Sequence, residues 1–381
     1  MTVSDVKWIE IDRSALKANL ASAIELAGAA RLMAVVKADA YGHGAAEVSR
    51  LALAAGASCL GVLNVSEARV LREAGIHGTI VLLSPPLPEE AEGAVRAGVE
   101  ATVDSLGLAK ALDRAAARLG RTVRVHADLD YGLGRWGIAP RSLPDFLKGL
   151  AGLRRVRLAG LSAHIDYVPG KNAVDAEEKL RDFHKRSLRA RETFFPRAAP
   201  GSRPEAEGAA GALEGRSAAA PGPLCHAANT SVLLEFPHWR MDMVRLGNLL
   251  YGINPTRKDI SLQDPWRLYA RIIALRRVNK GRSIGYAGET VAHKSMVVAT
   301  LPVGYSDGLT MEPAERLIGL GSGFQYWGML RGRKTPLIGR CAISHVLVDV
   351  SGVPDVRVGD AVALPVRRTA ASSRIPRVYI R

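Results

Sequence analysis

A lysine and a tyrosine follow an apolar run in the segment AVVKADAYGHG, residues 34–44. Lys37 is an amine at the end of a predicted strand, where it could form a Schiff base with an aldehyde cofactor. Partial burial would lower the pKa of this amine toward that of a useful base. A lone lysine at a strand end more often points into solvent, so the interpretation depends on the side chains gathered around it.

Polar clusters also follow the later apolar runs. They lie in ADLDYGLGRWG, GLSAHID, HAANTS and VRLGNLLYG, and their polar or small members are Asp128, Arg135, His164, Asn229, Thr230, Arg245 and Gly247. Arginine binds carboxylates and aromatic rings in a fixed geometry, and small residues let backbone N–H groups approach a phosphate. Each residue alone has an ordinary structural explanation, such as a buried histidine, a helix cap or a turn. Repeated on successive strands, they predict a site for a ligand with a phosphate and a carboxylate.

The elements that would position these residues alternate between short apolar runs and amphipathic segments from about residue 30 to about 255, as in a parallel sheet. Eight runs predict strands, at residues 31–36, 59–63, 79–83, 99–103, 122–129, 157–165, 223–227 and 242–247. Eight strands predict an α/β fold with an N-terminal (β/α)8 TIM-type barrel, whose chemistry lies at the carboxyl ends of the strands. A doubly wound sheet is the alternative, but the GxGxxG turn of dinucleotide binders is missing after the first strand.

The last third of the chain has a different pattern. Beyond about residue 265, β-branched runs separated by Gly and Pro predict a mainly β C-terminal domain. We therefore expect a ligand-binding barrel at 1–255 and a β-rich domain at 256–381, with a strand in 1–12 packed on the second domain. Of the 27 residues at 196–222, 18 are Ala, Gly or Pro, which predicts a flexible insertion because so few large apolar groups cannot form a core.

The net charge of +15 would suit nucleic acid or a membrane surface. The basic residues are dispersed, however, and only 5% of residues are aromatic, which leaves few surfaces for base stacking. We therefore expect no nucleic-acid or membrane partner. Three scattered cysteines, no 18-residue apolar run and no signal peptide are typical of a cytoplasmic protein without a disulfide framework or a metal site.

The motifs together resemble the alanine racemases, which are pyridoxal-phosphate enzymes of fold type III. The resemblance is carried by AVVKADAYGHG, LGRWG, GLSAHI, HAANTS, VRLGNLLYGINP, IGYAGET, LPVGYSDG and PLIGR, in that order, with only the insertion foreign to it. It implies an isomerase that interconverts L-alanine and D-alanine with pyridoxal 5'-phosphate and supplies D-alanine for peptidoglycan. It also implies a homodimer with sites at the interface, in which Lys37 binds the cofactor covalently.

The resemblance implies roles for the other polar residues. Tyr41, Thr230 and the Gly247 backbone would hold the phosphate. Arg135 would face the phenolic oxygen of the cofactor and the substrate carboxylate, while Arg245 would meet the pyridine nitrogen. Because a guanidinium has a pKa above about 12, it is a poor proton donor and leaves that nitrogen unprotonated. A weaker electron sink favours return of the proton to Cα over transamination or elimination.

A second base is implied in the C-terminal domain. Racemisation removes a proton on one face of Cα and delivers it on the other, so two groups are expected. Lys37 would serve one face, and Tyr286, reaching into the barrel of the partner subunit, would serve the other. A free tyrosine ionises at about pH 10, so we expect His164 and Arg245 to act as cations that lower its pKa. Tyr305 would stand at the substrate entrance.

Several positions depart from the family pattern. Asp128 stands where a carbamylated lysine usually adjoins the ring-facing arginine, and its carboxylate can orient that arginine unmodified. Thr230 replaces a serine. Ile343 and Ser344 replace a Met-Asp pair. The methionine of that pair contributes mainly its backbone N–H to the substrate carboxylate, so Ile343 would still bind this group. Ser373 replaces a tyrosine at the entrance, which predicts a longer pocket that also admits serine or longer or basic amino acids.

Three hypotheses therefore stand side by side. The first is a racemase of alanine, or of a relative such as serine or lysine. The second is a non-catalytic pyridoxal-phosphate-binding protein of the same barrel type, and the third is a basic nucleic-acid-binding protein. The non-catalytic carriers resemble the barrel alone, so a β domain that contains Tyr286 favours the racemase.

Overall fold

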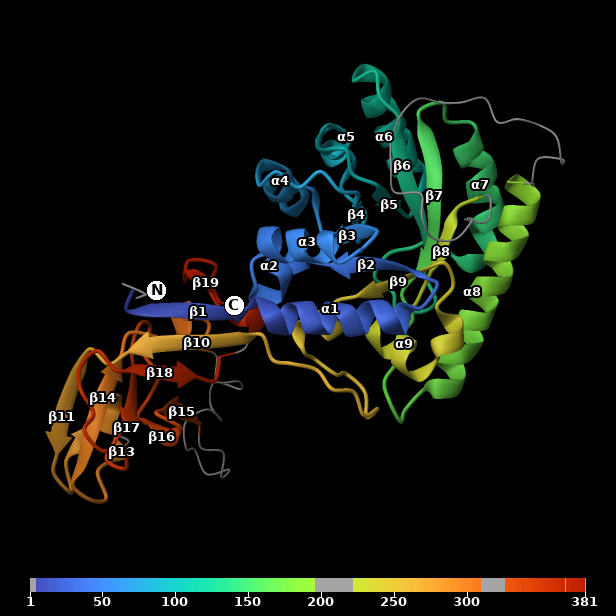
Figure 1. The fold of residues 1–381 in the computed structure, drawn as a ribbon. Coiled ribbons are helices and arrows are strands. Elements are labelled where there is room, and N and C mark those ends of the chain that lie inside the picture. The colour runs from blue at the N-terminus through green and yellow to red at the C-terminus, as the bar shows by residue number, and fades with distance from the viewer. Residues whose placement is uncertain (1–4, 196–221, 289, 310–325, 367, 381) are drawn as a thin grey trace. The chain divides into compact units, whose positions relative to one another are not determined.

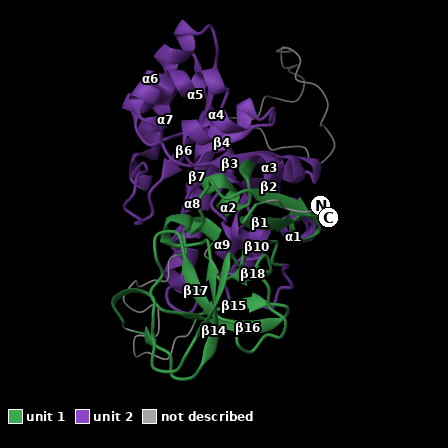
Figure 2. Ribbon diagram, turned by 90° about the vertical axis from the view of Figure 1, so that its left-hand side faces the viewer, with its two compact units in different colours: residues 1–16, 38–45, 264–381 green, residues 17–37, 46–263 purple. Residues whose placement is uncertain are grey.

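The computed structural model describes residues 5–195, 222–288, 290–309, 326–366 and 368–380. Apart from Gly222, the predicted insertion at 196–222 lies outside these residues. The chain divides into two compact units (Figure 2). The barrel unit comprises Lys17–Lys37 and Ala46–Gln263, and the β unit comprises Met1–Leu16, Ala38–Ala45 and Asp264–Arg381.

The described residues of the barrel unit include eight parallel strands. These are β2 (Arg31–Val35), β3 (Cys59–Val62), β4 (Ile80–Leu82), β5 (Ala101–Val103), β6 (Val123–Leu129), β7 (Val156–Ala163), β8 (Leu224–His226) and β9 (Met243–Leu246). They pair in two groups, in the orders β4-β3-β2-β9 and β5-β6-β7-β8. Glu100 joins the groups on one side, through backbone hydrogen bonds with Ile80 and Leu82. On the other side, the Arg245 N–H donates to the Ala228 C=O beside β8. The sheet therefore closes on itself, which confirms the predicted (β/α)8 barrel.

The strands form where the apolar runs lie. All four residues of β3 and four of the five in β2 are buried. A parallel strand that is covered by helices has no solvent-facing side, so its hydrophobicity is continuous rather than alternating. This continuity made the runs recognisable, and all eight predicted strands occur with ends within two residues of those expected.

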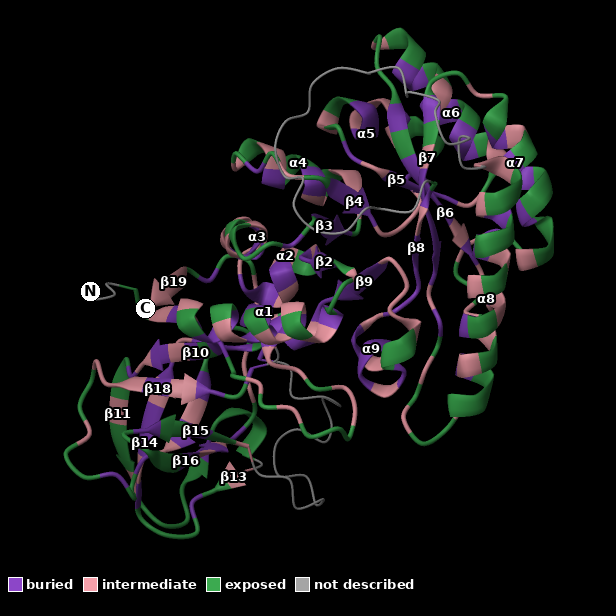
Figure 3. Ribbon diagram, turned by 45° about the vertical axis from the view of Figure 1, so that its right-hand side comes forward, coloured by how far each residue is buried: buried purple, intermediate pink, exposed green. Residues whose placement is uncertain are grey.

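Helices lie between the strands in the sequence and outside them in space (Figure 1). They are α1 (Arg13–Ala27), α3 (Ala45–Ala54), α4 (Val65–Glu73), α5 (Ala91–Ala97), α6 (Leu106–Arg118), α7 (Leu143–Ala151), α8 (Ala173–Phe194) and α9 (Thr230–Glu235). Asn64 begins α4 by accepting the Glu67 N–H, and Ser105 begins α6 by accepting the Leu108 N–H. Figure 3 shows the result, with buried and exposed positions alternating around the helices. In α6 the buried residues include Leu108, Leu112 and Ala115.

The segment after β2 forms a left-handed helical turn, α2 (Lys37–Gly42), in which residues 38–41 all have φ between 52° and 54°. Residues with a side chain avoid this conformation by about 1–2 kcal/mol each, so the turn needs support from its surroundings. Within the β unit, Asp39 Oδ1 accepts the Ala45 N–H at 2.8 Å. Arg377 pairs with the same carboxylate at 3.3 Å. These contacts hold a backbone that propensity alone would not form.

In the part of the β unit that the structure describes, nine strands form one sheet with the order β11-β14-β17-β16-β15-β18-β10-β1-β19. Its strands are β1 (Lys7–Asp12), β10 (Trp266–Arg271), β11 (Ala274–Val278), β14 (Met296–Leu301), β15 (Trp327–Leu330), β16 (Arg333–Ile338), β17 (Val346–Asp349), β18 (Ala361–Leu364) and β19 (Arg377–Ile380). Near the N-terminus, β1 pairs antiparallel with β10 and parallel with β19. A separate hairpin joins β12 (Ser283–Ile284) to β13 (Thr290–Val291). The predicted mainly β C-terminal domain is confirmed.

Candidate active site

Lys37 lies two residues beyond the last residue of β2 and is half-buried. The pKa of Lys37 is lowered, mainly because burial disfavours the charged amine. Repulsion from Arg135 and Arg245 lowers it further, whereas Glu67 acts in the opposite direction. More of this amine is therefore neutral than in an exposed lysine, as a nucleophile or a base requires.

Arg245 lies on β9 with only 8% of its surface exposed. Its Nη1 donates to His226 Nδ1 at 2.7 Å, and its Nη2 donates to the Ala163 C=O at 2.8 Å. Burial lowers the pKa of Arg245 to about 10, against the attraction of the Asp128 carboxylate. The site therefore keeps a guanidinium cation at neutral pH, held in a fixed orientation.

Asp128 lies on β6, and its Oδ1 accepts the Ser162 hydroxyl at 2.5 Å. Burial raises the pKa of Asp128 to about 6, although hydrogen bonds from Ser162 and Trp136 and attraction to Arg245 and Arg135 oppose the rise. Arg135 follows in the loop after β6, with its guanidinium 4.4 Å from the centre of the Trp136 ring. The carboxylate thus faces the two arginines that the sequence assigned to the ligand, and partly balances their charge.

His164 follows β7 and is half-buried. Its expected role as a cation is wrong. Burial, followed by repulsion from Arg245, Arg135 and Lys37, lowers the pKa of His164 to about 3. The ring is therefore uncharged at neutral pH, because burial disfavours its charged form and the neighbouring arginines and Lys37 would repel another cation.

Thr230 and Gly247 lie beyond the ends of β8 and β9. Thr230 is buried and begins α9, and the Asn229 side chain caps this helix by accepting the Val232 N–H at 3.0 Å. Gly247 precedes the 3₁₀ turn Asn248–Tyr251. Both positions present backbone at the barrel end where parallel strands collect their ligands, which fits the binding of a phosphate.

The remaining predicted residues belong to the β unit. Tyr41 lies in the left-handed turn, and burial raises its pKa, so the phenol stays protonated and can donate a hydrogen bond. Tyr286, Tyr305 and Ile343 are 68%, 53% and 59% exposed. The Tyr305 N–H donates to the Ala342 C=O at 3.1 Å, so the loops that carry Tyr305 and Ile343 are neighbours.

The structure thus brings together Lys37, Arg135, His164 and Arg245 within the barrel unit, where each affects the charge of another. It adds residues that the sequence did not single out. Glu100, His126 and His226 form a hydrogen-bonded row that ends at Arg245. The signal available in the sequence was weak, since a histidine in an apolar strand is more often an ordinary buried residue.

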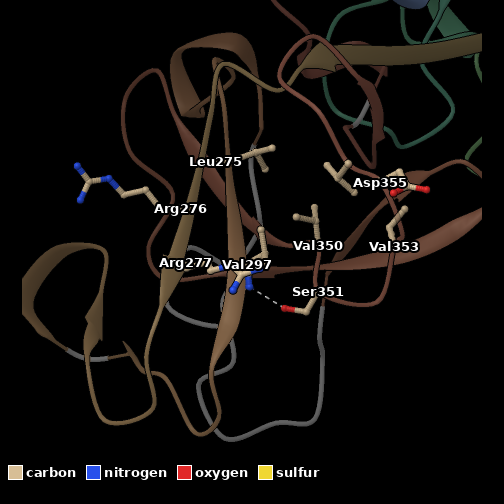
Figure 4. A pocket seen from close by; sticks show the side chains of 9 residues that line it. Leu275, Arg276, Arg277, Val297, Val350, Ser351, Val353 and Asp355 are labelled. Atoms are coloured by element: carbon tan, nitrogen blue, oxygen red, sulfur yellow. Dashed lines mark hydrogen bonds between the residues drawn. The ribbon is translucent and has the colours of Figure 1, made fainter.

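A cavity of about 380 Å³ lies elsewhere, in the β unit (Figure 4). Its lining residues are mostly aliphatic and include Leu275, Val297, Val350 and Val353. None of the predicted site residues lines it. The barrel end remains the candidate active site. Among the described residues, no group of three or more His, Cys, Asp or Glu is placed to hold a metal ion.

The chain matches two family models. The alanine racemase N-terminal domain matches residues 11–255, and the alanine racemase C-terminal domain matches residues 266–376. The alanine racemase of Desulfosudis oleivorans is 34% identical over 368 residues, covering 94% of this chain and 86% of the relative. That of Halothermothrix orenii is 32% identical over 362 residues, with the same coverage.

Solved structures agree on the fold. The alanine racemase of Clostridium difficile 630 superposes with a TM-score of 0.85 at 24% identity, covering 100% of this chain and 97% of that one. The alanine racemase from D-cycloserine producing Streptomyces lavendulae gives a TM-score of 0.80 at 25% identity, covering 100% and 98%. Together with the lysine at the end of the first barrel strand, these matches define a barrel enzyme with a C-terminal β domain. The chain belongs to the alanine racemase family.

No helix among the described residues is long and apolar enough to cross a membrane.

Proposed function

We propose that this protein is an alanine racemase that uses pyridoxal 5'-phosphate to interconvert L-alanine and D-alanine. The observation that carries the proposal is Lys37, a half-buried amine with a lowered pKa at the end of β2, with Arg135 and Arg245 acting on it. Family membership and relatives named alanine racemase support the choice of substrate.

The donor set of the barrel end fits this cofactor. A partly neutral amine suits an aldehyde, and two arginines with an uncharged histidine suit an anionic ligand. Lys37 would hold the cofactor, and Tyr41, Thr230 and Gly247 would bind its phosphate. When bound, pyridoxal phosphate supplies the electron sink that makes the α-hydrogen of an amino acid acidic.

The other side chains bind the substrate and move its proton. Arg135 would bind the substrate carboxylate, aided by the backbone N–H of Ile343. Arg245 remains protonated at neutral pH because its pKa is about 10, so it contributes charge rather than a proton. Lys37 would exchange the proton on one face of Cα and Tyr286 on the other.

We also propose a cytoplasmic homodimer in which Tyr286 and Tyr305 serve the site of the partner subunit. The large exposed fractions of these tyrosines support this, because a phenol that acts as a base needs a surrounding site. A cytoplasmic location agrees with three scattered free cysteines.

The test is a racemisation assay with alanine, serine, methionine and lysine, on the native protein and on Ser373→Tyr. We expect kcat/KM for alanine to exceed that of the others by about 10-fold or more for each methylene that the pocket rejects. Comparable turnover of lysine, restricted by Ser373→Tyr, would instead identify a racemase of broad specificity. No racemisation of any of the four would overturn the proposal.

A further inference from the structure

Four polar side chains form a row of hydrogen bonds through the barrel interior. His126 Nε2 lies 2.7 Å from Glu100 Oε2, and His126 Nδ1 lies 2.9 Å from His226 Nε2. His226 Nδ1 then meets Arg245 Nη1 at 2.7 Å. The two histidines are 1% and 2% exposed, so water does not compete for these bonds.

The two ends of the row fix the direction of every bond in it. A guanidinium can only donate, so His226 Nδ1 must accept from Arg245, and the ring proton of His226 then lies on Nε2. That proton is donated to His126 Nδ1. An ionised carboxylate can only accept, so His126 donates its own Nε2 proton to Glu100.

Glu100 is held ionised at the far end. Burial tends to raise its pKa, but the hydrogen bonds from His126 and Arg124 and the charge of Arg124 outweigh burial, and the pKa of Glu100 is lowered. Arg124, on the exposed side, lies 2.6 Å from Glu100 Oε1. Each carboxylate oxygen therefore has its own donor, and the oxygen that faces His126 remains an acceptor.

The backbone makes room for this arrangement. The pairing of β6 with β7 changes register between Val125 and His126, which places His126 opposite Gly160. A Cβ at residue 160 would overlap the His126 imidazole. The irregularity and the glycine together admit a ring that an ordinary strand pair would exclude.

We propose that Glu100 is a positioning residue for Arg245, which acts by fixing both histidines as Nε2–H tautomers. With these tautomers, His226 presents a lone pair to the guanidinium. With the opposite ones, the Nδ1–H of His226 would face the Nη1–H of Arg245, and the arginine would lose this bond. The expected effect on activity rests on the proposed racemase function. The assignment of the tautomers does not depend on that function.

The Glu100→Gln variant tests this assignment, because a carboxamide can donate as well as accept and so removes the fixed direction. In cofactor-free protein labelled with ¹⁵N-histidine, NMR should show both rings as Nε2–H tautomers in the native chain. His126→Gln and His226→Gln identify the two signals. In Glu100→Gln only Arg245 still favours the Nε2–H tautomers, so both signals should move part of the way toward the Nδ1–H form. Glu92→Gln is the matched control, since Glu92 is a surface glutamate of the same unit that pairs with Arg96 and Arg118.

Activity gives an independent readout. Loss of an outer hydrogen-bonding partner costs roughly 10-fold or more at metal sites, and we expect a similar fall in kcat for Glu100→Gln, with little change in KM. Glu100→Asp keeps a group that can only accept, so its kcat should lie between those of Glu100→Gln and the native protein. Nδ1–H tautomers in the native protein, or unchanged tautomers in Glu100→Gln, would overturn the assignment. A native protein with the expected tautomers but no racemisation would refute only the proposed function.

Discussion

At the scale of single residues, the environment of the site disfavours the charge of one basic side chain and leaves that of another unchanged. Lys37 is surrounded by a low-dielectric barrel end and two arginines, so the positive charge that it would carry elsewhere is disfavoured. Arg245 keeps its charge despite burial, since even a pKa of about 10 leaves it protonated at neutral pH. The same environment therefore favours the neutral form of the Lys37 amine and keeps a guanidinium cation on the neighbouring strand.

We predict that Lys37→Ala abolishes covalent attachment of pyridoxal phosphate and racemisation. An attached cofactor would absorb at about 420 nm, and borohydride would remove that band. The variant should lack this band, and borohydride should therefore leave its spectrum unchanged. Lys148→Ala, at an exposed helix lysine paired with Asp145, is the control and should behave as the native protein does. A yellow, reducible Lys37→Ala protein would show that another lysine carries the cofactor.

A second residue-scale prediction concerns Asp128, whose pKa of about 6 in the folded protein exceeds the ordinary 3.8. The folded state binds this proton more tightly than the unfolded chain does, so the contribution is fully present at low pH. It is lost as pH rises from about 4 to about 6. Asp128→Asn cannot titrate, so its stability relative to the native protein should rise across that interval by about 1–3 kcal/mol.

Thermal unfolding at a series of pH values measures this difference. Asp145→Asn, at an exposed position on α7, is the control. The change with pH is the informative quantity, because exchange of the protonated carboxyl for an amide beside the Ser162 hydroxyl adds an offset that does not depend on pH. A constant difference between Asp128→Asn and the native protein from pH 4 to 7 would contradict a raised pKa.

Lys37 and Arg245 could be found from the sequence because they follow or lie in recognisable apolar runs, and barrels place such residues at one end. His164 could be located in the same way, but its charge could not. Whether a histidine is a cation depends on burial and on neighbours from other strands, which no local pattern reports. The row from Glu100 to His226 was also unpredictable, because it depends on a change of register between β6 and β7 that no local pattern reports.

At the scale of elements, the strands were predictable and the left-handed turn was not. A buried parallel strand has a continuous apolar composition, and β3, β4 and β5 are buried along their whole length. Residues 38–41 have no glycine, and propensity argues against four successive left-handed residues. Such strain persists only where contacts such as that of Asp39 with Arg377 over-determine the backbone, and it concentrates at functional sites.

The β6–β7 pair gives a prediction at this scale. Gly160→Ala places a methyl group on the His126 ring, so either the ring or a strand must shift. Overpacking of this kind costs about 1–3 kcal/mol of unfolding free energy, which urea denaturation can measure. Gly107→Ala in α6 meets nothing closer than 3.9 Å and should instead stabilise by about 0.5–1 kcal/mol. Equal effects of the two variants would mean that β7 tolerates a side chain beside His126.

At the scale of the whole molecule, the proposed site residues are divided between the two units of the chain. The barrel unit contains Lys37 and the arginines, and the β unit contains Tyr286, Tyr305 and Ile343. In the proposed two-base mechanism, groups on opposite faces of one carbon exchange the proton, so Lys37 and Tyr286 would both have to serve each site. Symmetric dimers solve this by exchange, since each subunit can lend the same residue to the other.

Complementation tests that exchange directly. Lys37→Ala and Tyr286→Phe each remove one of the two bases, so neither homodimer should racemise alanine. In a mixed dimer, one site combines both defects, while the other combines an intact Lys37 with an intact Tyr286. Mixed dimers, produced by co-expression with two different affinity tags and purified on both, should therefore regain about half of the native activity. If Tyr286 serves the barrel of its own chain, every site in the mixed dimer retains one defect, and purified mixed dimers will be as inactive as the two parents.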